Sequence, residues 1–121
     1  MHKLRYVLAV AIAATLYVGF APAHSYLAKS SPAADAVVMQ APKEIRLSFN
    51  EGIQPRSSNV ALTRSDGQKV QTGRASIDPE KGSDLVLAVP SLQAGRYEVR
   101  WQAISLDSHR IQGRFGFEIR P

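Results

Sequence analysis

The chain has no cysteine among its 121 residues, and this excludes several kinds of chemistry at once. Without thiolates it can hold neither a cysteine-ligated metal nor a cysteine nucleophile. Small exported domains are often stabilised by disulfides. A domain of this composition must instead be held together by side-chain packing.

The chain also lacks an apolar run long enough to cross a bilayer as a helix. Its longest such run, residues 7–20, has 14 residues, fewer than the roughly 18 to 20 that a spanning helix needs. It follows Lys3 and Arg5 and precedes Ala21-Pro22-Ala23, which is the layout of a secretory signal peptide. We therefore expect export, with an uncleaved membrane anchor as the alternative.

Two cleavage points fit the small residues that end this segment. Cleavage after Ala21 leaves Pro22 at the new N-terminus, and cleavage after Ala23 leaves His24 there. Proline restricts the backbone and lacks an N–H, which disfavours the first site. We therefore expect residues 1–23 to be a signal peptide, and residues 24–121 to be one domain that does not span the membrane after cleavage.

Cationic charge is modest in the expected mature chain. Without Lys3 and Arg5, 13 of the 15 basic residues remain against 10 acidic ones, so the net charge falls from +5 to +3. The arginines form no run, and no aromatic residues are interleaved with them to stack on bases. We expect no nucleic-acid partner, and we interpret the arginines as the solvated face of alternating strands.

Apolar and polar residues alternate over short segments, the pattern of half-buried strands. Five segments show it clearly: 44–50, 59–64, 84–89, 95–105 and 110–120. A turn at Asp66-Gly67 predicts a returning strand over residues 69–72, and residues 24–32 would add a first strand. About seven strands and no amphipathic helix predict an antiparallel β-sandwich, with Trp101 as a core anchor.

Three ionisable residues continue the buried-face pattern just beyond the strand ends. Extending the alternation by two residues after Phe49 gives Glu51, and extending the 95–105 segment gives Asp107 and His109. We expect these side chains to line a partly shielded pocket at the rim of the sandwich. Asp107 and His109 lie about 6.6 Å apart along an extended backbone, so both could reach one ion. An ordinary hydrogen-bonded turn is the alternative.

His24 would add two donors to this group if it is the mature N-terminus. Its free amine and its imidazole could chelate one metal, and Asp107 and His109 would complete a set of three nitrogens and one oxygen. Such a set suits Cu(II) in a tetragonal arrangement. Zinc could use the same atoms but does not need an amine ligand. The residues alone leave open that His24 is an inert terminal residue.

Longer stretches of the sequence resemble the CopC family of periplasmic copper-binding proteins. The resemblance is carried by HSYLAKSSPAADAVVMQAPKEIRLSFNEGI near the start and AGRYEVRWQAISLDSHRIQGRFGFEIRP at the end. It implies a seven-stranded Greek-key β-sandwich of Ig-like or cupredoxin-like type. It also implies Cu(II) ligands at the amine and imidazole of His24, at Asp107 and at His109, with Glu51 in a supporting role beside them.

The sequence departs from some members of that family in its methionines. Residues 51–75 contain none, and Met39 is the only methionine in the expected mature chain. A Cu(I) site needs several soft sulfur donors, so the resemblance implies a protein that binds Cu(II) only. It would be a monomer that sequesters copper or delivers it to a CopD-like inner-membrane transporter, and not an enzyme. A copper monooxygenase of the lytic polysaccharide type and a metal-free adhesion or assembly domain are the alternatives.

Overall fold

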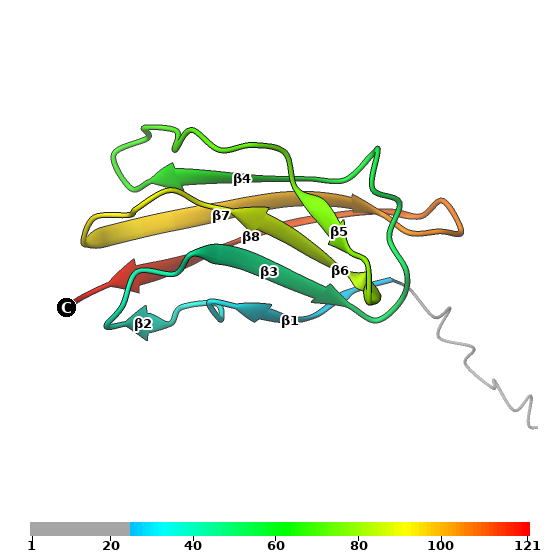
Figure 1. The fold of residues 1–121 in the computed structure, drawn as a ribbon, viewed down its shortest axis with the longest axis horizontal. Coiled ribbons are helices and arrows are strands. Elements are labelled where there is room, and N and C mark those ends of the chain that lie inside the picture. The colour runs from blue at the N-terminus through cyan, green and yellow to red at the C-terminus, as the bar shows by residue number, and fades with distance from the viewer. Residues whose placement is uncertain (1–24) are drawn as a thin grey trace, which may run out of the picture.

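The computed structural model describes residues 25–121, which form two four-stranded sheets (Figure 1). One sheet has the order β1-β3-β6-β5 and the other β2-β8-β7-β4. The strands are β1 (Leu27–Ser31), β2 (Val37–Val38), β3 (Glu44–Phe49), β4 (Asn59–Arg64), β5 (Ser76–Asp78), β6 (Lys81–Ala88), β7 (Gly95–Ile104) and β8 (Arg110–Ile119). The all-β sandwich predicted from the sequence is confirmed. Within these residues no helix is long and apolar enough to cross a membrane.

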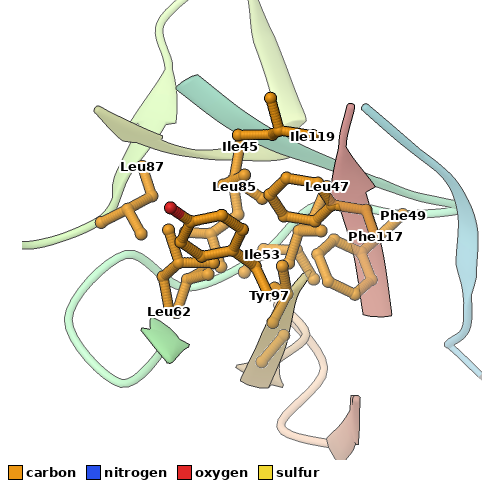
Figure 2. Close-up of a cluster of buried hydrophobic side chains, with 13 residues drawn as sticks. Ile45, Leu47, Phe49, Ile53, Leu62, Leu85, Leu87, Tyr97, Phe117 and Ile119 are labelled. Atoms are coloured by element: carbon orange, nitrogen blue, oxygen red, sulfur yellow. The ribbon is translucent and has the colours of Figure 1, made fainter. Parts of the chain in front are cut away.

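Alternate residues of the strands fill the space between the sheets. The buried cluster includes Ile45 and Leu47 of β3, both with no exposed surface (Figure 2). Val99 of β7 is also fully buried in this cluster. Trp101 packs at the edge of this cluster, with its ring centroid 5.2 Å from that of Phe49 at an angle of 69°. The core-anchor role predicted for Trp101 is thus confirmed, although the residue is only partly buried.

The number of strands is eight, and the prediction of seven was wrong. β2 pairs with the end of β8 in parallel, Val37 opposite Glu118 and Val38 opposite Ile119, so the expectation of purely antiparallel pairing was also wrong. Two residues are too few to show an alternating pattern in the sequence. β5 was missed for a similar reason, because its three residues include only one apolar side chain, Ile77.

The predicted strand over residues 69–72 is not formed. The Asp66-Gly67 turn is present, with a left-handed φ of 88° at Gly67 and a 2.8 Å hydrogen bond from Arg64 N to Gln68 O. Beyond the turn only Thr63 and Lys69 form a bridge, and one more bond joins Val70 N to Leu62 O. Val70 is the only apolar residue of this segment. Burial of apolar side chains therefore contributes little free energy to stabilise a longer strand in this segment.

At one end of the sandwich the segment after β3 is joined to the end of β7. Ile53 pairs with Ser105, and Gln54 N donates to Ile104 O at 2.7 Å. Leu106 N donates to Gly52 O at 3.0 Å. Figure 1 shows that the start of the described chain, the segment leaving β3 and the β7–β8 hairpin all lie at this end, opposite the C-terminus.

Candidate metal centre

Glu51, Asp107 and His109 come together at this end of the sandwich. One ligand atom from each lies within 4.8 Å of the other two. Glu51 follows β3 of one sheet, whereas Asp107 and His109 belong to the hairpin between β7 and β8 of the other. The structure therefore brings these three side chains together, and their role as metal ligands stays a prediction.

The hairpin that carries Asp107 and His109 is organised around the hydroxyl of Ser105. Ser105, which has no exposed surface, donates to Asp107 Oδ1 and accepts a 3.0 Å hydrogen bond from His109 N. Ser105 N donates to His109 O at 2.9 Å, and Ser108 N donates to Ser105 O at the same distance. Ser108 takes a left-handed φ of 70°, which turns the chain between the two ligand candidates.

The Asp107 carboxyl is biased toward its charged form. The hydrogen bond from Ser105 is the main cause that lowers the pKa of Asp107 below its ordinary value. Burial opposes this shift, and the nearby His109, whose Nδ1 lies 3.2 Å from Asp107 Oδ2, lowers the pKa further. An ionised carboxylate is the form that a cation requires.

Glu51 is anchored to the first residue that the structure describes. Its Oε1 accepts a hydrogen bond from the hydroxyl of Ser25, which is buried. The register of β1 and β3 explains this contact. Leu27 lies opposite Phe49 at the end of the ladder, and Tyr26 N donates to Asn50 Oδ1 at 2.7 Å just beyond it. Ser25 and Glu51 each lie two residues beyond the Leu27–Phe49 pair and so come close together. One carboxylate oxygen of Glu51 thus remains for a further interaction.

The ligand candidates are more exposed than a partly shielded pocket implies. The side chains of Asp107 and His109 are 54% and 60% accessible, and Glu51 is half-buried. The physical reason is the hairpin, which projects Asp107 and His109 beyond the last buried position, Ser105. His24, the remaining predicted ligand, lies outside the described residues.

Ser25 and Ser105 contribute to the site but were not predicted from the sequence. Ser105 continues the alternation of buried residues in β7 and directly precedes the acidic hairpin, and a buried hydroxyl there must find a partner. The alternation of buried residues could therefore have identified Ser105 as part of the site. The role of Ser25 depends on the β1–β3 register, which no local pattern in the sequence reveals.

The described part of the site offers one imidazole and two carboxylates. These are donors for a divalent cation of borderline hardness, and the open position toward solvent would allow an ion to enter and leave. Three donors alone do not determine which metal binds.

A sequence model of the CopC domain matches residues 27–120. The chain belongs to the CopC family. The match covers every strand of the sandwich, both strands that flank the candidate centre and the Asp107–His109 hairpin.

Curated and solved relatives agree with this assignment. Protein YobA of Escherichia coli K12 is 31% identical over 120 residues, which cover 98% of this chain and 96% of that protein. The crystal structure of CopC from Methylosinus trichosporium OB3b superposes with a TM-score of 0.76 at 33% identity, covering 81% of this chain and 95% of that one. The crystal structure of PcoC from Escherichia coli, described as a methionine-rich copper resistance protein, superposes with a TM-score of 0.73 at 31% identity. The superposition covers 81% of this chain and 100% of that one.

Proposed function

We propose that this chain is a periplasmic protein that binds Cu(II) for copper resistance, homeostasis or delivery. The observation that carries the proposal is the convergence of Glu51, Asp107 and His109 within 4.8 Å, in a chain of the CopC family. Two sheets contribute to this convergence, and a buried serine holds the hairpin ligands in place. Related proteins named for copper resistance support copper as the cargo.

His24 is the fourth residue of the proposed site. It is covalently bonded to Ser25, and consecutive Cα atoms lie 3.8 Å apart. Since Ser25 donates to Glu51, the peptide chain enters the described structure at the candidate centre itself. With the signal peptide removed after Ala23, the free amine and imidazole of His24 would join Asp107 and His109 on Cu(II). Glu51 supports them, either as a nearby acceptor or as a further oxygen ligand.

The donors and the position of methionine both favour Cu(II) over Cu(I). Nitrogen and oxygen ligands suit Cu(II), whereas Cu(I) prefers sulfur. Met39 follows β2, which pairs with the C-terminal end of β8, whereas His109 precedes the first residue of that strand. Ten residues of strand place the two about 30 Å apart. Met39 therefore does not supply sulfur to this centre.

The exposure of the site fits a carrier that passes its cargo on. A metal held by the half-accessible side chains of Asp107 and His109 can be reached by ligands of another protein. A CopD-like inner-membrane copper transporter is the partner that the family resemblance suggests. Binding should weaken as the pH falls, because nitrogen ligands must lose their protons to coordinate a metal.

Extension of the N-terminus by one residue tests the proposal. A chain that begins at His24 should bind Cu(II) much more tightly than the same chain with one alanine added before it, because the extension removes the free amine of His24. Affinity would be measured by competition with a chelator, and the nitrogen ligands counted by electron paramagnetic resonance. His109→Ala in the unextended chain is the control that removes a different nitrogen.

Three outcomes would overturn the proposal in different ways. Equal affinity of the two chains would exclude the amine chelate. Unchanged affinity in His109→Ala would exclude the hairpin as the site. Copper-dependent cleavage of polysaccharide in the presence of a reductant would replace a carrier with an enzyme.

A further inference from the structure

The outer face of the β4–β7–β8 sheet is strongly cationic, which the distribution of arginines in the sequence did not reveal. Residues that alternate with the buried ones in β7 and β8 point away from the core. The arginines at these positions and directly after β8 are Arg96, Arg100, Arg110, Arg114 and Arg120. The only carboxylates among them are Glu98 and Glu118.

Ion pairs neutralise one half of this face more completely than the other. Glu118 contacts Arg96 at 3.9 Å and Arg120 at 2.8 Å, and Glu98 contacts Arg100 at 2.5 Å. Within residues 25–121, Arg110 and Arg114 form no salt bridge. The uncompensated charge thus lies toward the β7–β8 hairpin.

Arg100 and Arg114 lie directly opposite each other in the β7–β8 ladder. Like charges in this position destabilise a sheet, because the side chains are only about 5 Å apart at their Cβ atoms. On the other side of Arg100 the β4 partner is Ala61, which is too small to cover the guanidinium. Glu98 compensates this pair in part, because it forms an ion pair with Arg100 and attracts Arg114 electrostatically. Two guanidinium groups against one carboxylate leave a net positive charge at the centre of the exposed sheet.

A groove of about 460 Å³ runs over this pair of arginines. Besides Arg100 and Arg114, its walls carry the carboxamides of Asn59, Gln102 and Gln112. These residues come from β4, β7 and β8, which are neighbours in the sheet (Figure 1). Within the described part of the chain, these three carboxamides have no hydrogen-bond partner. They can both donate and accept, as an incoming peptide backbone requires.

We infer that this groove binds an extended acidic segment of a partner protein. Guanidinium groups bind carboxylates through paired hydrogen bonds, and the carboxamides would bind the peptide groups between the acidic side chains. A lipid surface fits less well, since the exposed large apolar residues, Tyr26, Val37, Met39 and Leu106, lie outside the groove. The inference does not depend on the proposed copper site.

The probe is a capped peptide of alternating glutamate and serine, titrated into the ¹⁵N-labelled chain at low salt. We expect the amide resonances around Arg100 and Arg114 to shift, and the affinity to fall as salt is added. A peptide with glutamine in place of glutamate should leave these resonances unchanged. Equal shifts with both peptides would overturn a charge-based site.

Arg114→Glu separates binding from folding, because it should weaken binding of the acidic peptide without lowering the melting temperature. It places a carboxylate opposite Arg100 in the β7–β8 ladder and so removes the like-charge contact there. Binding of the acidic peptide should fall by about tenfold or more, because a paired guanidinium–carboxylate contact is lost. Arg114→Gln, with the same expected direction of binding, covers the case in which the first variant folds poorly.

Arg74→Glu is the matched control, because Arg74 is exposed, lies outside the groove and undergoes the same change of charge. Its binding should change much less than that of Arg114→Glu, because Arg74 does not line the groove and makes no direct contact with a peptide bound there. Equal losses of peptide affinity in Arg74→Glu and Arg114→Glu would show attraction by net charge alone and would overturn the groove as the binding site. Binding to phosphatidylglycerol vesicles without binding to the peptide would overturn the inference that the partner is a protein.

Discussion

The hydroxyl of Ser25 donates a hydrogen bond to the carboxylate of Glu51, 26 residues further along the chain. This contact joins the first described residue to the acidic group that faces Asp107 and His109. It makes the position of Glu51 depend on the pairing of β1 with β3, and hence on the segment that follows His24.

Replacement of Ser25 by alanine should therefore weaken copper binding more than it weakens the fold. Glu51 would lose the partner that fixes it, and loss of such a supporting contact typically lowers metal affinity by about tenfold or more. Ser30→Ala is the matched control, because Ser30 donates to Pro32 O, away from the site. Copper titration of both variants, together with their melting temperatures, checks this prediction. Equal affinities of the two variants would contradict it.

Ser105→Ala should raise the pKa of Asp107 in the metal-free protein. The Ser105 hydroxyl is the main cause of the lowered pKa, so its removal should move the value back toward the ordinary range. NMR titration of the Asp107 carboxyl measures the shift. Ser58→Ala is the control: Ser58 is also buried and bridges Gln54 O and Ile104 N. Both variants should lose about 1–3 kcal/mol of stability, but only Ser105→Ala should move this pKa.

Acid should destabilise the protein partly through Asp78. Arg46 Nη1 lies 2.7 Å from Asp78 and 2.9 Å from Asp84, and its hydrogen bond is the main cause that lowers the pKa of Asp78. A carboxyl with a lowered pKa in the folded state stabilises the fold above its ordinary pKa of 3.8, and this contribution is lost as the pH falls below that value.

The melting temperature of Asp78→Asn should accordingly fall less than that of the natural protein between pH 5 and pH 2. Asp66→Asn, which alters an exposed carboxylate 4.0 Å from Arg64, is the control and should follow the natural protein. Thermal unfolding followed by circular dichroism over this pH range measures the difference. Parallel curves for all three proteins would show that the Arg46–Asp78 contact does not contribute.

Gly113→Ala should destabilise the sandwich by about 1–3 kcal/mol, since overpacking displaces well-packed neighbours. A Cβ at residue 113 would lie 2.6 Å from the ring of Trp101, which itself packs edge-on against Phe49. Gly73→Ala is the control, because a Cβ there would meet nothing within 4 Å. Urea unfolding of the two variants compares them, and a Gly113→Ala protein as stable as the control would show that the Trp101 ring moves freely.

The sequence was sufficient for features that depend on local alternation. The segments that became β3, β4, β7 and β8 were each recognisable, and continuing their pattern located Glu51, Asp107 and His109. Alternation carries this information because a strand places every second residue on one face.

Features that depend on pairing between distant segments could not be predicted in this way. β2 is ordered by its parallel contact with β8, and the Arg100–Arg114 pair exists only because of the register of two long strands. The anchoring of Glu51 by Ser25 has the same origin. The arginines were interpreted as a dispersed solvated set because the sequence shows their spacing but not which strands are neighbours.

The hydrogen bonds that join Gly52 and Gln54 to the end of β7 have a kinetic consequence for the proposed copper site. The amides of Leu106 and Gln54 exchange with solvent only when these bonds open. Glu51 belongs to one of the two segments that these hydrogen bonds join, and Asp107 follows the other. An ion bound to both residues would therefore oppose the opening of the hydrogen bonds. Slower hydrogen exchange at these two amides would report occupancy of the site, even with a spectroscopically silent metal such as zinc.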